Sequence, residues 1–166
     1  MMKKFEFTGE TKTIQLAFRT VTLHRIRAVA EFGLIKVGDI GGWLEKEENL
    51  SQEGKAWVWG NAKVWGNAEV CGDAEVWGNA EVFLASHVLV IGAIGSRDGF
   101  TTFYRDKDNE ITVKCGCFLG KIDKFLERVT QTHGDSKYAL VYKAAVEVAK
   151  LQIDLDCIAP EKDSNE

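Results

Sequence analysis

The sequence lacks several features that define common classes of protein. No apolar run approaches the roughly 18 residues that cross a bilayer, and the N-terminal residues MMKKFE lack the apolar stretch of a signal peptide. The formal net charge is only -4 at pH 7, so no general basic field attracts nucleic acid. We therefore expect the 166 residues to form a soluble, cytoplasmic protein that binds no membrane, DNA or RNA.

Cysteine and histidine are too few, and wrongly spaced, to indicate a metal centre. The four cysteines are Cys71, Cys115, Cys117 and Cys157, and only one residue separates Cys115 from Cys117, not the two of a zinc knuckle. We interpret them as small buried side chains in a reducing compartment. The glycine-rich segment 38–43 lacks the Gly-Lys-Ser/Thr ending of a phosphate loop, and nothing resembles a Ser-His-Asp array. We expect no metal and no cofactor.

The sequence does contain a repeat of six residues. Five consecutive hexads, GKAWVW, GNAKVW, GNAEVC, GDAEVW and GNAEVF, run from residue 54 to residue 83. Glycine followed by Asn or Asp suits a corner, because these residues tolerate positive φ. An α-helix would need a period of 3.6 residues, and each glycine would cost it about 1 kcal/mol. Collagen would need glycine at every third position. Both alternatives therefore fit the sequence worse than a β-structure with a corner in every hexad.

The repeat predicts a short left-handed parallel β-helix over about residues 55–90. Three hexads close a triangular coil of 18 residues, valine and the smaller alanine fill the interior, and like residues stack one coil apart. Two coils bury little surface on their own, and outward tryptophans would leave a large apolar area in water, so we expect a homotrimer. A stacked aromatic ladder that binds glycans is an alternative use of the same side chains. The expected stacks are Val58 on Val76, Val64 on Val82, Trp59 on Trp77, Trp65 on Phe83 and Asn61 on Asn79, with Trp59, Trp65 and Trp77 pointing outward.

The flanks predict a mainly β chain with two C-terminal helices. We expect an N-terminal β segment with a glycine-rich loop (1–43), the left-handed β-helix (44–92), a β-hairpin with a two-helix region (93–158) and a disordered tail (159–166). The hairpin is predicted from two strands at 100–105 and 111–115, and an earlier turn is expected at Gly9-Glu10.

Glycine and polar residues mark the two predicted helices. The first, which contains Ile122 and Val129, is expected to end near Gly134, which suits a C-cap. The second is expected to begin at Asp135 or Ser136 and to run to about Asp154. Helical spacing predicts that its inward residues are Tyr138, Val141, Ala145 and Val148.

Several short motifs resemble a known family. GDIGGWLE (38–45), NLSQEG (49–54) and the repeats are similar to the hexapeptide-repeat proteins of bacteriophages and prophages, often labelled transferases or polymer-forming proteins. IGSR (94–97), TTFYR (101–105), KCGCF (114–118) and THGD (132–135) are similar to the C-terminal part of those proteins, so the resemblance covers nearly the whole chain. It implies the β-helical fold and a location in the cytoplasm of an infected or lysogenic bacterium. Small oligomeric phage proteins of this kind include antidefence sponges, which sequester the nucleotide signals of bacterial immune systems.

Polar and basic residues gather after the repeats and predict an anion site. Arginine forks bind phosphate bidentately, hydroxyls and loop amides such as that of Gly95 complete a cradle, and an aromatic ring stacks a base. Alternate strand residues point to opposite faces, so one face supplies part of a pocket and a trimer interface could supply the rest. In the alternative, Arg97 and Arg105 are surface ion-pair residues beside Asp98, Asp106 and Asp108. The predicted ligand-binding residues are Ser96, Arg97, Thr101, Thr102, Tyr104, Arg105, Lys114 and His133.

Three hypotheses about function follow. The first is a non-catalytic phage protein that binds and sequesters a small nucleotide-type immune signal, such as a cyclic nucleotide or a cyclic ADP-ribose-like molecule, and so inhibits antiphage defence. The second is an acyl-CoA-dependent acyltransferase, because hexapeptide coils form the body of many such enzymes. Such enzymes use a histidine base beside the coils, and only His87 lies there. The third is a structural trimer whose tryptophan faces bind a host protein. The first is favoured, and it assigns no catalytic residue.

Overall fold

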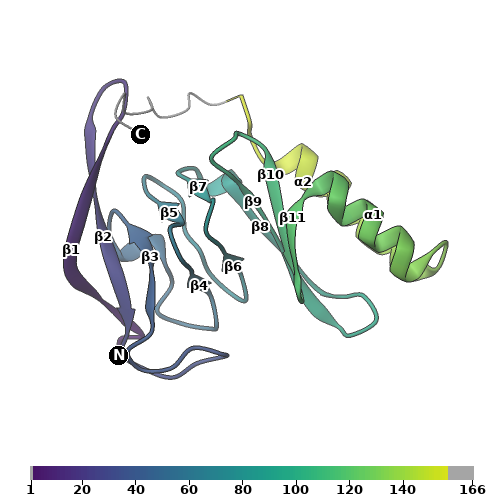
Figure 1. Ribbon diagram of the computed structural model, residues 1–166, viewed down its shortest axis with the longest axis horizontal. Helices are drawn as coiled ribbons and strands as arrows, with labels where there is room; N and C mark the ends of the chain where they lie inside the picture. Colours follow the sequence, from purple (N-terminus) through teal and green to yellow (C-terminus); the bar gives the residue numbers. More distant parts are fainter. Residues whose placement is uncertain (1, 157–166) are drawn as a thin grey trace.

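The computed structural model describes residues 2–156, and its elements lie in a row along the longest axis (Figure 1). The hairpin of β1 (Phe5–Gln15) and β2 (Thr20–Ala28) stands at one end, followed by β3 (Ile40–Leu44) and the short 3-10 helix η1 (Glu47–Asn49). The repeats contribute β4 (Trp57–Val58), β5 (Lys63–Val64), β6 (Glu75–Val76) and β7 (Glu81–Val82), and η2 (Ala85–His87) closes them. The predicted tail at 159–166 lies outside the described residues.

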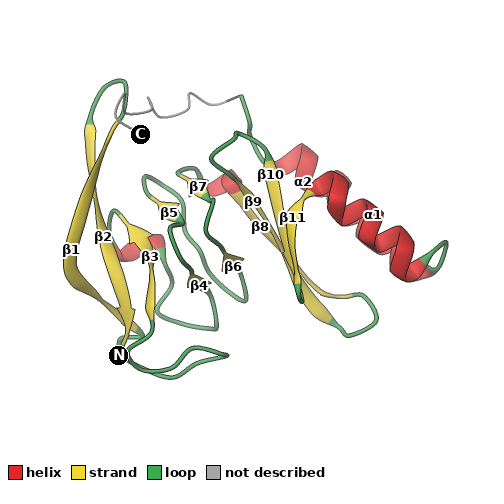
Figure 2. Cartoon of the chain, viewed as in Figure 1, coloured by secondary structure: helices red, strands yellow, loops and turns green. Residues whose placement is uncertain are grey.

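An antiparallel sheet and two helices form the other end of the molecule. The sheet contains β8 (Val88–Ile94), β9 (Gly99–Arg105), β10 (Ile111–Cys115) and β11 (Phe118–Lys121), in the order β11-β10-β9-β8. The helices are α1 (Ile122–His133) and α2 (Lys137–Gln152), and they cover the side of the sheet that faces away from the repeats (Figure 2). The described chain is therefore mainly β with two C-terminal helices, as the sequence predicted. Within residues 2–156, no helix is long and apolar enough to span a membrane.

Neighbouring strands of the repeats are parallel and lie one 18-residue step apart. Val58 pairs with Val76, and Val64 pairs with Val82. The Trp59 and Trp77 rings stack with centroids 4.5 Å apart, and Trp65 stacks on Phe83 at 5.0 Å. These four predicted stacks are confirmed. All the repeat valines (Val58, Val64, Val70, Val76, Val82) and alanines (Ala56, Ala62, Ala68, Ala74, Ala80) are buried in one core.

One mixed sheet joins the repeats to the N-terminal hairpin. Its order is β1-β2-β3-β5-β7, antiparallel up to β3 and parallel beyond it, so β3 crosses the predicted boundary between residues 43 and 44. Leu44 pairs with Val64. A Cβ on Gly42 would lie 2.6 Å from the Ala62 carbonyl oxygen, which explains glycine at this close approach.

The N-terminal hairpin corrects two sequence-based expectations. Trp65 was predicted to point outward to solvent, but it is buried, because the hairpin covers it in a cluster with Val21, Leu23 and Trp43. Trp59 and Trp77 are only partly buried. Gly9 does not form the hairpin turn. It lies at a shift of register between Phe7 and Thr11, with a φ of 96° that suits glycine.

The predicted C-terminal elements are largely confirmed. β9 and β10 form the expected hairpin, with Arg105 opposite Ile111. α1 ends at Gly134, which has a φ of 57°. The predicted inward face of α2 was partly wrong: Ala145 is buried, but Tyr138 and Val148 are exposed, and the buried stripe consists of Ala139, Ala145, Val146 and Ala149. Small alanines let α2 approach β8 and α1 closely, which the pattern of large apolar residues did not indicate.

Candidate functional site

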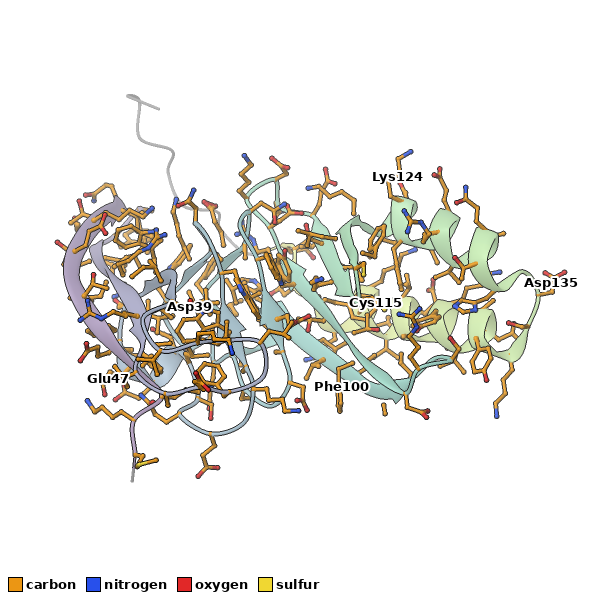
Figure 3. The ribbon with its side chains drawn as sticks, turned by 60° about the horizontal axis from the view of Figure 1, so that its bottom comes forward. Asp39, Glu47, Phe100, Cys115, Lys124 and Asp135 are labelled. Atoms are coloured by element: carbon orange, nitrogen blue, oxygen red, sulfur yellow. The ribbon has the colours of Figure 1, made fainter. Side chains whose placement is uncertain are left out.

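A cavity of about 850 Å³ lies between the repeats and the helical end of the molecule. Three walls contribute to it, and Figure 3 shows Cys115 and Phe100 between the repeats and the helices. The repeats and the loop before β3 supply Gly33, Leu34, Ile35, Lys55, Trp59, Asp73 and Glu75. The antiparallel sheet supplies Ser96, Arg97, Gly99, Phe100, Cys115, Gly116, Cys117 and Phe118. The helices supply Phe125, Arg128, Val129, Thr132, His133 and Tyr142.

A tight turn presents Ser96 and Arg97 to the cavity. The Asp98 amide donates a hydrogen bond to the Gly95 carbonyl at 3.3 Å, which makes Ser96 and Arg97 the two central residues of a β-turn between β8 and β9. Both side chains are exposed. Gly95 has a φ of 82°, and a Cβ there would lie 1.9 Å from the Tyr142 hydroxyl oxygen. Only glycine therefore allows the turn to lie against α2 at this point.

Helix α1 brings Arg128 and His133 to the same cavity. His133 is the last residue of the helix, and its ring stacks on Tyr142 with centroids 5.7 Å apart. The guanidinium carbon of Arg128 lies 5.9 Å from the centroid of Phe118. Within residues 2–156, no carboxylate forms an ion pair with Arg97, Arg128 or Lys55. Three cations of the cavity wall are thus available to an anion.

The repeats supply aromatic and acidic groups opposite these cations. Trp59 stacks on Trp77, and Lys114 lies over the other tryptophan, its ammonium 5.3 Å from the Trp77 centroid. Burial raises the pKa of Glu75 above its ordinary value, and the charge of Lys114 opposes that rise. Asp73 lies in the same wall. The cavity therefore has a flat apolar surface beside two carboxyl groups.

A thiol and a phenol lie close together in the sheet and helix walls. Cys115 Sγ accepts a hydrogen bond from Thr101 Oγ1 at 3.2 Å and lies 3.9 Å from the Tyr142 hydroxyl. Burial, together with this thiol, raises the pKa of Tyr142 to about 12, so the phenol is neutral at physiological pH. Within residues 2–156, no three His, Cys, Asp or Glu side chains are placed to hold a metal ion. Cys157 lies outside the described residues.

The structure brings three of the eight predicted binding residues into the cavity and leaves five outside its lining. Ser96, Arg97 and His133 line it. Lys114 lies nearby and donates to the Gly116 carbonyl. The other four, Thr101, Thr102, Tyr104 and Arg105, are buried on β9. Only the first two residues of β9, Gly99 and Phe100, line the cavity; from Thr101 to Arg105 the strand is buried, because the repeats cover one side of it and the helices the other.

The buried β9 residues have partners within the protein. Thr102 Oγ1 accepts from the Glu75 amide at 3.0 Å, and the Tyr104 hydroxyl donates to Asn79 Oδ1 at 3.3 Å. Burial raises the pKa of Tyr104. Arg105 donates to the Glu81 carbonyl at 2.7 Å and to Asn109 Oδ1 at 3.0 Å. These contacts attach the sheet to the repeats, and Arg105 is not a surface ion-pair residue.

Sequence reasoning missed Trp59, Glu75, Arg128 and Tyr142 as cavity residues. The repeat marked Trp59 as a stacking residue, but no local signal placed it opposite a helix 70 residues later in the chain. Arg128 is an ordinary charged residue of an amphipathic helix in the sequence. The cavity arises from tertiary packing, which no short motif encodes.

The two remaining histidines lie outside the cavity lining. His87 is fully buried: its Nδ1 accepts from the Phe83 and Leu84 amides, both at 3.1 Å, and its Nε2 lies 3.1 Å from the Asp154 carbonyl oxygen. Burial, assisted by the charge of Arg105, lowers the pKa of His87 to about 4. His24 stacks on Phe7 in the N-terminal hairpin.

Comparison with known proteins adds no relative. No protein-family model matches the chain, and no curated protein matches its sequence.

Proposed function

We propose that this protein binds a small nucleotide-type anion in the cavity and holds it without chemical change. The observation that carries the proposal is that one cavity of about 850 Å³ combines a stacking surface with cations that form no ion pair among the described residues. That volume is within the range of pockets that enclose small organic ligands, about 300–1,000 Å³. Arginine binds phosphate bidentately, and an aromatic ring can stack on any of the nucleobases.

The two sides of the cavity suit the two ends of a nucleotide. Arg97 and Arg128, with His133 beside them, attract phosphate oxygens. Asp73 and Glu75 repel phosphate, but a carboxylate accepts hydrogen bonds from ribose hydroxyls or from the amino group of a base. Trp59, adjacent to these carboxylates in the repeats, provides the stacking face. The ligand would therefore lie with its base toward the repeats and its phosphates toward the turn and the helix.

The biological role proposed for this binding is a phage antidefence sponge. The resemblance of the repeats and of the IGSR, TTFYR and KCGCF motifs to phage hexapeptide-repeat proteins motivates this role. A sponge needs affinity and abundance but no catalytic group, which agrees with a site of cations and aromatic rings. The candidate ligands are immune signals such as cyclic nucleotides and cyclic ADP-ribose-like molecules.

We also propose that the repeats form a short left-handed parallel β-helix within a homotrimer. The parallel 18-residue register and the inward valines support the coil geometry. The partly buried Trp59 and Trp77 support an interface, but the intramolecular burial of Trp65 reduces the apolar area available for it. The trimer is tested by the mass of the protein in solution, which should be a multiple of three chains.

The binding proposal is tested by depletion and recovery. Purified protein is mixed separately with cyclic ADP-ribose, a cyclic dinucleotide and acetyl-CoA, free ligand is measured, and the protein is then heated to release what it bound. We expect one nucleotide to be depleted and then recovered with its mass unchanged. An altered product would refute sequestration and favour an enzyme. No depletion by any probe would refute nucleotide binding and favour a host-protein partner.

Two arginine variants separate the cavity from the general surface. Arg97→Ala should weaken binding about 10- to 100-fold, since a hydrogen bond to a charged group is worth about 1.5–3 kcal/mol. Arg27→Ala is the matched control, because Arg27 on β2 is not among the lining residues of the cavity and its guanidinium forms an ion pair with Glu6. Equal losses in both variants would show that net charge, not the cavity, governs binding.

The acyltransferase hypothesis is less well supported by the site. A general base must present a free nitrogen to the reacting group. His87 has both ring nitrogens bonded to backbone groups and is fully buried. The acetyl-CoA arm of the depletion experiment tests this alternative directly.

A further inference from the structure

Helix α2 has a second apolar face, opposite the face that packs on β8 and α1. Leu140, Val148 and Leu151 are 63%, 48% and 89% exposed, and Ala144 between them is also exposed. At about 100° per residue, these four side chains lie within roughly 80° of the helix circumference. A helix that is apolar on two sides is typically covered on both. Within residues 2–156, nothing covers this outer face.

Charged side chains run along one edge of this face. Lys143, Glu147 and Lys150 are all exposed, and Lys150 lies 3.6 Å from Glu147 in the same helix. The sign of the charge alternates along the edge. When two copies of one helix pair antiparallel about a twofold axis, the same edge of each copy lies on the same side of the pair. Each lysine on that edge then faces a residue of the other copy.

A single antiparallel register matches both the apolar and the charged residues. With the twofold axis level with residues 145–146, Leu140 lies opposite Leu151 of the second copy, and Ala144 lies opposite Val148, each to within one residue along the helix. The same register places Lys143 opposite Glu147 of the second copy. Leucines therefore meet at both ends, the small Ala144 lies near the crossing, and two opposite-charge pairs form at the rim.

We propose that this outer face of α2 binds a second copy of the same chain through antiparallel helix pairing. The charge complementarity of the Lys143–Glu147 edge with itself is the argument for a second copy and against an unrelated partner. The same surface of both copies forms the interface, so the pairing doubles the number of chains in any assembly that the repeats form. It does not depend on the proposed ligand, because the cavity residues of α2, such as Tyr142, lie on the opposite side of the helix.

The test measures the mass of the full 166-residue chain by sedimentation equilibrium. The mass should be an even multiple of 18.5 kDa. Leu140→Glu with Leu151→Glu should halve it and leave the circular dichroism spectrum unchanged, because both side chains face solvent in the single chain. A monomeric or odd-numbered wild-type assembly, or an unchanged mass in the double variant, would overturn the proposal.

A charge-reversal pair makes the test specific to the register. Lys143→Glu alone replaces two attractive contacts with two repulsive ones and should weaken association about tenfold. Adding Glu147→Lys reverses both members of the pair and should restore it. Arg27→Glu, on β2, is the control for a charge reversal elsewhere on the surface and should leave association unchanged. If the double reversal associates no better than Lys143→Glu, the antiparallel register is wrong.

Discussion

Acidification from pH 7 to pH 5 should destabilise the protein through His87. In the folded protein, Nδ1 of His87 accepts hydrogen bonds from the Phe83 and Leu84 amides. A proton on Nδ1 would remove this acceptor and make its N–H point at two other N–H groups. Burial lowers the pKa of this group to about 4 from its ordinary 6.5. His87 therefore becomes protonated near pH 6.5 in the unfolded chain but only near pH 4 in the folded chain.

The sign and size of the effect follow from proton linkage. Between these two pKa values the unfolded state binds more protons than the folded state, so the free energy of unfolding falls as the pH falls. A single group with these values removes about 2 kcal/mol between pH 7 and pH 5, and about 3 kcal/mol once both states are protonated. That is a substantial part of the stability of a typical domain. The loss should begin near pH 6.5 and level off near pH 4.

Urea unfolding measured at several pH values is the assay. His87→Asn is the matched variant, because its Oδ1 can accept from the Phe83 and Leu84 amides and does not titrate in this range. The variant should be less stable than the wild type at pH 7, where it lacks the Asp154 contact, and the difference should shrink as the pH falls. Titrating carboxyl groups, including Glu45 and Glu75, contribute equally to both proteins and cancel in the comparison. A constant difference from pH 7 to pH 5 would refute the assignment of the proton to His87.

Two further variants test the core and the turn at the cavity. Val64→Asp should abolish folding, because Val64 is fully buried between Leu44 and Val82 and an unpaired charge there costs more than the domain can supply; a soluble variant with a wild-type circular dichroism spectrum would contradict the inward packing of the repeats. Gly95→Ala should lower stability by about 1–3 kcal/mol in thermal unfolding, because its backbone is in the left-handed region and its Cβ collides with the Tyr142 hydroxyl. Adding Tyr142→Phe should recover only the part that is due to the hydroxyl, because the ring carbon Cζ still lies 2.7 Å from the added Cβ and the backbone strain remains; full recovery would show that neither contributes.

The repeats were predictable because their signal is local and redundant. Each hexad specifies the same small set of interactions, so the partners of Val58 and Val64 followed from the period alone. The hairpin of β9 and β10 and the end of α1 at Gly134 were similarly marked by alternation and by glycine. The position of Trp65 was not predictable, because its burial depends on a hairpin about 40 residues earlier that returns to cover it.

The candidate site was predicted only in part for a related physical reason. Arg97 and His133 were identified by residue type, and both line the cavity. Arg105 has the same chemistry, yet it is buried by the repeats and bonded to the Glu81 carbonyl. Residue type shows what a side chain can bind, but the burial of β9 decides which side chains reach the cavity. That burial is set by contacts between segments far apart in the sequence.

The contacts of His87 also set a limit on the length of the repeats. The Phe83 and Leu84 amides lie at the end of the last hexad and donate hydrogen bonds to the His87 imidazole. The neighbouring Asn79 carbonyl accepts a hydrogen bond from the Lys107 amide. Further hexads, whether inserted into this chain or donated by another molecule, would have to displace these groups before they could pair with the last repeat. At the other end, β2 and β3 occupy the edge in the same way. Lengthening the repeats by gene duplication, or joining molecules end to end into fibres, would therefore require the flanking segments to be rebuilt at the same time.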